Sequence, residues 1–253
     1  MGSMWLDPPE DPKVYPMQGL PVLPFDATKM TAANEFLDDR WGADFQGLLW
    51  IIDFLKQPLW QVKVSTGIAM PPATTSQDMK DALQELVNLQ ETLRQEAMPE
   101  ILAQATDFQM WFCAQLGLYP RSHPKSYLFL KLVARIGELV MVYLKYKYNA
   151  VRPSQVYPRL TPPVPVPPHA SYPSGHAMNS YLMALATAEI VPDLGDAAER
   201  LAQRIAKNRE IAGLHFWWDS LAGKIAAENT FGLFKTLPKY IAYRDAAIDE
   251  WSN

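Results

Sequence analysis

The sequence has little of what would mark a disulfide-bonded, nucleic-acid-binding or membrane-spanning protein. It has one cysteine, Cys113, so no intramolecular disulfide can form. The cysteine content therefore does not indicate whether the protein works in an oxidising or a reducing compartment. With 23 basic and 27 acidic residues its net charge is -4, which offers no overall attraction to nucleic acid. Its longest apolar runs, such as residues 139–144, fall well short of the roughly 20 residues needed to cross a bilayer. We therefore expect a soluble protein with no transmembrane segment and no nucleic-acid partner.

The start of the chain also lacks a charged segment followed by an apolar stretch, the pattern of a signal peptide. A signal peptide is removed from a mature protein, so its absence does not fix the compartment. We expect a periplasmic or secreted protein if one has been removed, and a cytoplasmic protein otherwise.

No stretch alternates apolar and polar residues between turn signals, so no strand is predicted. Apolar residues instead recur at helical spacing, and the fold class we expect is all-α, a compact multi-helix bundle. The large side chains of residues 41–55 are expected in its core. The predicted helices cover residues 41–55, about 77–93 after Ser76, 99–116 from Pro99, about 125–149, about 174–191, and from an N-cap near Asp196 past Arg209 toward Thr230, with a possible irregularity at Gly213.

Two stretches are rich in proline. The first predicts an extended N-terminal arm over residues 1–30, ahead of a single helical domain at 31–253. The second, residues 153–173, contains the polyproline-like bridge 162–168. The bridge could be a ligand for an SH3-type partner, but we favour a rigid connection because candidate site residues lie at both of its ends.

A first candidate cluster consists of Lys145 and Arg152, which are followed by Pro153. A spacing of seven is close to two helical turns, which predicts that both cations lie on one helical face and reach a shared anion. Pro153 disfavours helical geometry at Arg152 and so places it at a helix end. The alternative is an ordinary pair of surface cations.

A second cluster, Pro173-Ser174-Gly175-His176, directly precedes an apolar helical stretch. A helix N-terminus presents unpaired N–H groups and the positive end of the helix dipole to an anion. Gly175 permits close approach of the backbone, Ser174 adds a hydroxyl donor and His176 can deliver a proton. The alternative is a proline turn with an ordinary N-cap serine.

A third cluster comprises Arg209, His215 and Asp219. A spacing of four on one helix would let Asp219 accept a hydrogen bond from Nδ1 of His215 and leave Nε2 with a free lone pair. That tautomer is the one a nucleophilic histidine requires. The alternative is a buried histidine held by a carboxylate.

Together the clusters provide three cations, two histidines, a helix N-terminus and one carboxylate, an inventory suited to displacing a group from a tetrahedral oxyanion. The sequence resembles the type 2 phosphatidic acid phosphatase and vanadium haloperoxidase superfamily over residues 120–235, and in size it is most similar to the soluble bacterial class A non-specific acid phosphatases. The resemblance rests on three motifs in this order: Lys145-x6-Arg152-Pro153, Pro173-Ser174-Gly175-His176 and Arg209-x5-His215-x3-Asp219. It implies the helical bundle of that superfamily.

The resemblance also implies roles. Lys145, Arg152 and Arg209 would bind the phosphate oxygens, helped by the Ser174 hydroxyl and the Gly175 N–H. No metal would be required.

In the catalytic steps the resemblance implies that His215 attacks phosphorus and forms a phosphohistidine, while Asp219 orients it. His176 would protonate the leaving alcohol and then activate water. One departure is Asn208, which stands where the family usually has serine before the arginine of the third motif. We expect the oxyanion site to survive with a changed hydrogen-bond pattern.

The expected activity is a metal-independent phosphatase acting on a small-molecule or lipid phosphate, in a protein that can form a homodimer. The alternative is a vanadium-dependent haloperoxidase, in which His215 would ligate vanadate and His176 would act on bound peroxide. A third reading, from a different class, is a helical scaffold that binds phosphate or a partner without turnover.

Overall fold

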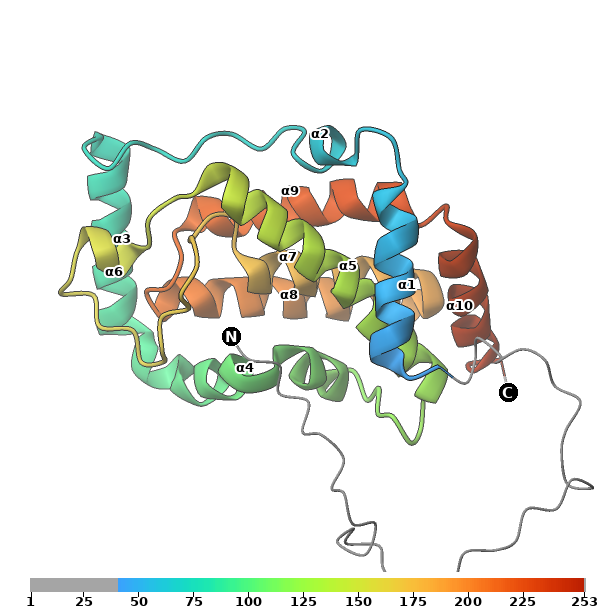
Figure 1. Cartoon of the computed structure of the whole chain (residues 1–253). Helices are drawn as coiled ribbons and strands as arrows, with labels where there is room; N and C mark the ends of the chain where they lie inside the picture. Colours follow the sequence, from blue (N-terminus) through green and yellow to red (C-terminus); the bar gives the residue numbers. More distant parts are fainter. Residues whose placement is uncertain (1–40, 253) are drawn as a thin grey trace, which may run out of the picture. The chain divides into compact units, whose positions relative to one another are not determined.

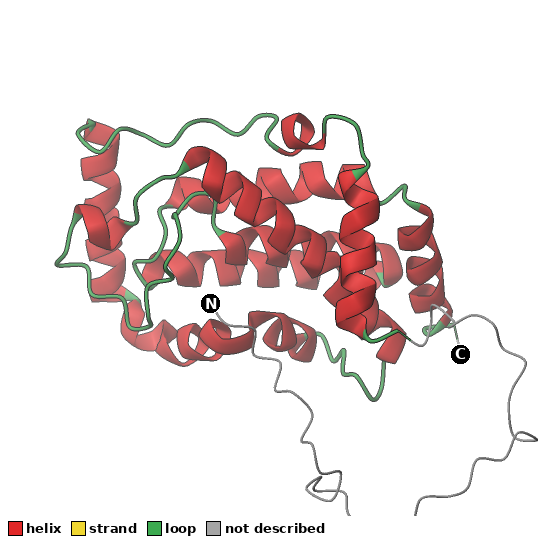
Figure 2. Ribbon diagram, viewed as in Figure 1, coloured by secondary structure: helices red, strands yellow, loops and turns green. Residues whose placement is uncertain are grey.

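Helices make up the regular secondary structure of residues 41–252, the range that the computed structural model describes, and no strand occurs within it. The expected all-α class is confirmed (Figure 2). The predicted arm at residues 1–30 lies outside the described residues, so the division into an arm and one domain stays a prediction. In chain order the helices are α1 (Ala43–Leu55), α2 (Trp60–Val64), α3 (Gln77–Thr92), α4 (Arg94–Gln115), α5 (Pro124–Tyr148), α6 (Pro153–Val156), α7 (Gly175–Ile190), the 3-10 helix η4 (Pro192–Leu194), α8 (Gly195–Ile211), α9 (Trp217–Phe234) and α10 (Pro238–Asp249).

Helix α7 is the centre of the bundle and packs against α5, α8 and α9 (Figure 1). Its sequence is apolar or small on every side, which is typical of a helix surrounded by others. Buried alanines let the neighbouring helices approach closely, and Leu182 and Met183 pack with Val133 and Ile136 of α5 in the main core. The first turn of α7 is therefore held deep inside the protein.

The start of α7 is fixed by a cap and by a close backbone contact. Ser174 is the N-cap, the role that the alternative reading of this cluster gave it, and its hydroxyl accepts a hydrogen bond from the Ala177 N–H. Gly223 of α9 lies against this turn, where an added Cβ would come within 2.9 Å of the Ser174 carbonyl oxygen. Only glycine lets α9 approach so closely.

Helix α4 differs from the prediction of a helix that starts at Pro99. It begins at Arg94, and Pro99 lies inside it. The helix is interrupted at Asp107, whose backbone is not helical (φ -147°, ψ 83°). The Asp107 carboxylate accepts from the Met110 N–H at 2.9 Å, which is an N-cap interaction for the second half. The actual boundary is thus an aspartate cap rather than a proline.

The predicted long helix from about Asp196 toward Thr230 is also wrong. Helix α8 starts at Gly195, with Asp196 in its first turn rather than at its cap, and it ends at Ile211. Gly213 then takes a left-handed backbone conformation (φ +72°), and α9 starts only at Trp217. The irregularity expected at Gly213 is a complete break between two helices.

Helix α1 confirms the predicted span, but its large side chains are not all in the core. Trp50 and Phe54 are buried, whereas Phe45, Leu48 and Ile52 are 61%, 55% and 51% exposed. The core prediction is therefore wrong for half of this helix. Within residues 41–252, no helix combines the length and the apolar character needed to cross a bilayer.

We predict that Gly213→Ala destabilises the protein by about 1–2 kcal/mol, because an L-residue is strained in the left-handed region. A Cβ there would also lie 3.1 Å from Nη2 of the buried Arg94. Urea denaturation measures the free energy of unfolding. Gly232→Ala is the control, because within residues 41–252 no atom beyond its chain neighbours and the nearby backbone of α9 lies within 4 Å of its Cβ position; it should stabilise by about 0.5–1 kcal/mol. Equal stability of wild type and Gly213→Ala would contradict the prediction.

Candidate active site

The three clusters come together where α5, α7, α8 and α9 start or end. The Ser174 N–H donates to the Asp219 carbonyl, Nζ of Lys145 donates to the Pro173 carbonyl, and Arg152 donates to the Leu214 carbonyl next to His215. These bonds link all three clusters. The eight candidate residues are placed as follows: Lys145 in the last turn of α5, Arg152 at the N-cap of α6, Ser174, Gly175 and His176 at the start of α7, Arg209 in the last turn of α8, His215 between α8 and α9, and Asp219 in the first turn of α9.

The three cations are buried: Lys145, Arg152 and Arg209 are 4%, 2% and 1% exposed. Lys145 donates to the carbonyl oxygens of Ala170, Ser171 and Pro173 at 2.8, 2.6 and 2.7 Å. Three such bonds need the ammonium form. Burial and then the charge of Arg152 lower the pKa of Lys145 to about 7, while Asp219 acts in the opposite direction.

Arg152 does not share a helical face with Lys145, so that part of the prediction is wrong. Helix α5 ends at Tyr148, Asn149 takes a left-handed conformation (φ +45°), and Arg152 is extended. The two cations still converge, because Arg152 turns back to the carbonyls of Leu214 and His169 at 3.1 and 3.0 Å. Its Nη2 also lies 3.1 Å from Nδ1 of His169.

His215 and Asp219 pair as predicted, although not within one helix. Nδ1 of His215 lies 2.9 Å from Oδ2 of Asp219, and His215 precedes the first residue of α9 by two positions. Because the carboxylate occupies Nδ1, the lone pair of Nε2 is free. The Ser171 hydroxyl donates to the same carboxylate oxygen and lies 3.3 Å from Nδ1 of His215. Sequence analysis missed Ser171, a buried third member of this pair.

His215 is neutral in this environment. Burial lowers its pKa well below the ordinary value, and the positive charges of Lys145, Arg152 and Arg209 lower it further. Burial raises the pKa of Asp219, whereas the bond from Ser171 and the charge of Lys145 act in the opposite direction. The imidazole is therefore a base with its lone pair available.

His176 lies at the partly exposed start of α7, under helix α4. Its Nε2 is 3.2 Å from the Gln104 carbonyl oxygen, and its ring centroid is 4.5 Å from that of Phe108. Burial and then the charge of Arg209 lower its pKa to about 3, against a raising effect of the Gln104 carbonyl. The ring is thus neutral in this environment.

Arg209 also contacts α4. Its Nη2 donates to the Ile101 carbonyl at 3.0 Å, and its Nε is buried with no hydrogen-bond partner within the described part of the chain. Burial lowers the pKa of Arg209 to about 10, so the group keeps its charge at neutral pH. The neighbouring Asn208 donates to Glu100 and Gln104 of α4 at 2.9 and 3.1 Å.

This arrangement can bind an anion and present a nucleophile to it. Three buried positive charges face a single buried carboxylate, and the N-terminus of α7 adds unpaired N–H groups at the same place. A tetrahedral oxyanion can accept from these donors while Nε2 of His215 approaches its central atom.

The segment that contains the site is similar to a known protein family. Residues 126–241 match the family model described as the PAP2 superfamily. The match covers 116 of the 253 residues of the chain. The matched segment contains all eight candidate residues, and α3 and α4 lie outside it.

One curated relative is a non-specific acid phosphatase of Providencia stuartii, 26% identical over 129 residues, which are 49% of this chain and 52% of that protein. The chain thus spans about half the length of this relative. A solved structure with a similar fold is a transmembrane PAP2 type phosphatidylglycerolphosphate phosphatase from Bacillus subtilis. It has a TM-score of 0.47 and 21% sequence identity, and the match covers 78% of this chain and 98% of that one.

We predict that His176 and His215 both stay neutral down to pH 5 in the anion-free protein. Burial and the neighbouring cations keep both pKa values well below the ordinary value of histidine. Titration of the imidazole nitrogens by NMR checks this, with His176→Gln and His215→Gln assigning the signals. An imidazolium signal from either ring at pH 6 would show that the cations act more weakly than the geometry indicates.

Proposed function

We propose that this protein is a metal-independent phosphatase that hydrolyses phosphate esters or anhydrides of small-molecule or lipid alcohols through a phosphohistidine. The observation that carries the proposal is the buried His215, whose Nδ1 is held by Asp219 while three buried cations surround it. The acid phosphatase relative favours phosphate transfer over the haloperoxidase alternative.

Binding of the phosphoryl group uses the cations first. Each is now held by backbone carbonyls, so its position is set before substrate arrives and little reorganisation is needed. A unit charge about 4 Å from a phosphate oxygen contributes on the order of 4 kcal/mol at an effective dielectric near 20. The Ser174 hydroxyl accepts from Ala177, so its own hydrogen is free to donate to the anion.

In the first chemical step Nε2 of His215 forms a bond to phosphorus as the bond to the leaving oxygen breaks. Asp219 stabilises the positive imidazole that results, and His176 gives a proton to the leaving oxygen. In the second step water attacks phosphorus, His176 takes its proton and the bond to His215 breaks. Phosphate is released and both histidines return to their starting state.

The proton on His176 has to arrive with the substrate, because burial and the charge of Arg209 keep this ring neutral. A bound phosphate carries negative charge into the site and thereby raises the pKa of His176. A monoanionic phosphate ester can also bring the proton itself. Both routes favour turnover on the acidic side of neutral.

The test is phosphate release from p-nitrophenyl phosphate. His215→Ala should abolish turnover, and His176→Ala should slow it by about 10²–10⁴-fold, with both variants folded. Vanadate should inhibit the wild type. Undiminished turnover by His215→Ala would defeat the proposal, and halide oxidation that needs added vanadate and hydrogen peroxide, without phosphate release, would support the haloperoxidase alternative.

We predict a second pH effect from Lys145. Because its pKa is lowered to about 7, the wild type should bind sulfate at least about tenfold more weakly at pH 9 than at pH 6. Sulfate is the probe because its charge is constant over this range. Calorimetry measures the sulfate affinity at each pH. Lys145→Arg is the control variant: its guanidinium stays charged, so its sulfate affinity should change little with pH. The same slope in both proteins would assign the effect to another group.

A further inference from the structure

Helix α4 brings next to the site a residue, Gln104, that no motif includes. Gln104 is completely buried (0% exposed), and its Nε2 has no hydrogen-bond partner among the described residues. A buried amide donor without a partner is costly, so native proteins nearly always satisfy it. A ligand oxygen is one way to do so.

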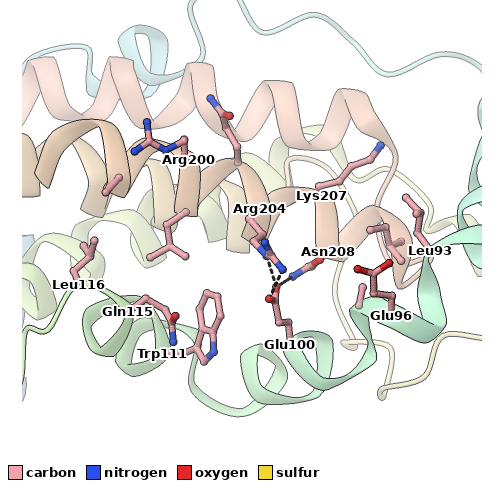
Figure 3. Close-up of a pocket in the computed structure, with 15 residues that line it drawn as sticks. Leu93, Glu96, Glu100, Trp111, Gln115, Leu116, Arg200, Arg204, Lys207 and Asn208 are labelled. Carbon is pink, nitrogen blue, oxygen red and sulfur yellow. Dashed lines mark hydrogen bonds and ion pairs between the residues drawn. The ribbon is translucent and has the colours of Figure 1, made fainter.

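The orientation of the Gln104 amide follows from a chain of bonds to α8. Arg204 binds both carboxylate oxygens of Glu100, at 2.6 and 2.5 Å, and Glu100 accepts from Nδ2 of Asn208 (Figure 3). A carboxylate paired with arginine only accepts, so this nitrogen of Asn208 must donate. Nδ2 also lies 3.1 Å from Oε1 of Gln104, which therefore accepts. The donor Nε2 of Gln104 is left without a partner.

The position of Gln104 is next to the phosphate-binding groups. Its own carbonyl oxygen is 3.2 Å from Nε2 of His176. The carbonyl of Ile101, one turn earlier on the same helix, accepts from Nη2 of Arg209, whose Nε is the other buried donor without a partner here. Both unsatisfied donors thus belong to the region where α4 meets the site: Nε2 of Gln104 on α4 and Nε of Arg209 on α8.

We propose that Nε2 of Gln104 donates a hydrogen bond to an oxygen of the bound phosphoryl group, and that Asn208 is the positioning residue that holds the amide for this contact. The inference rests on the proposed function and extends it to a helix outside the matched family segment. It also gives Asn208 a role: its amide has two N–H groups, and so it can hold Glu100 and Gln104 at once.

The test is the affinity for inorganic phosphate, measured by calorimetry and as product inhibition. Gln104→Met keeps the size of the side chain but has no donor, and it should weaken phosphate binding by about 10- to 100-fold, the usual effect of losing a hydrogen bond to a charged group. Gln104→Glu, with the same shape, should weaken it further by charge repulsion. This second variant decides the matter if the first does not fold.

Gln109→Met is the matched control on the same helix, since Nε2 of Gln109 donates to Glu138 and not to the site. It should bind phosphate like the wild type. Asn208→Ala should weaken binding less than Gln104→Met, and the double variant should bind like Gln104→Met alone, because Asn208 acts through the amide. An additive loss in the double variant would remove the positioning role.

Phosphate binding by Gln104→Met and Gln104→Glu equal to that of a wild type that does bind phosphate would overturn the inference and leave the proposed function intact. A wild type that neither binds nor releases phosphate would overturn both. Binding without turnover would refute only the phosphatase, and the comparison between the Gln104 variants and the control would still decide the role of Gln104.

Discussion

The structure depends on keeping three positive side chains out of water with only one carboxylate to balance them. Burying charge is unfavourable unless hydrogen bonds and opposite charge offset it. Main-chain carbonyls provide most of these hydrogen bonds. Lys145 donates to three carbonyl oxygens, Arg152 donates to those of His169 and Leu214, and Arg209 donates to that of Ile101. The loops before α7 and α9 are therefore shaped around the cations. The proline-rich stretch 153–173 supplies four of these carbonyls, those of His169, Ala170, Ser171 and Pro173.

The same constraint explains why α4 belongs to the site although the family match does not reach it. Arg209 needs an acceptor on the side away from the bundle core, and the Ile101 carbonyl provides it. His176 finds the Gln104 carbonyl and the Phe108 ring on the same helix. The ion pair between Arg204 and Glu100 and the bonds from Asn208 then join α4 to α8 (Figure 3). The interruption at Asp107 lets α4 change direction just beyond these contacts.

Sequence reasoning grouped the candidate residues correctly but gave the wrong geometric reason for their convergence. The pairs Lys145 with Arg152 and His215 with Asp219 do come together, but for a different reason than helical spacing. In each pair a helix boundary intervenes, and convergence comes from loops whose course is set by left-handed residues, Asn149 and Gly213. The Ser76 cap was predicted correctly, and the Ser174 cap was the alternative reading of its cluster; both have a local signature because their hydrogen bonds close within three residues. Such local signals do not require knowledge of the tertiary fold.

Ser171, Gln104 and the carbonyl of Ile101 had no comparable signal. Ser171 has no spacing that singles it out, and its partner Asp219 is 48 positions away. Gln104 meets Asn208 across 104 positions, on a helix that looked like ordinary bundle packing. A backbone carbonyl is present at every residue, so no sequence can mark the one that binds Arg209. What determines these contacts is the packing of α4 on α8, which exists only after folding.

The positive charge of the site shows why an anion suits it. With Lys145, Arg152 and Arg209 unopposed except by Asp219, both imidazoles are held neutral, although proton transfer needs one of them charged. A bound dianion would offset the positive charge of these side chains and so raise the pKa of His176, which is the protonation that the proposed mechanism requires. Water and neutral esters carry no charge that could do this. In the proposed phosphatase, electrostatics would therefore favour phosphate over neutral carbonyl compounds before any contact with the rest of the substrate.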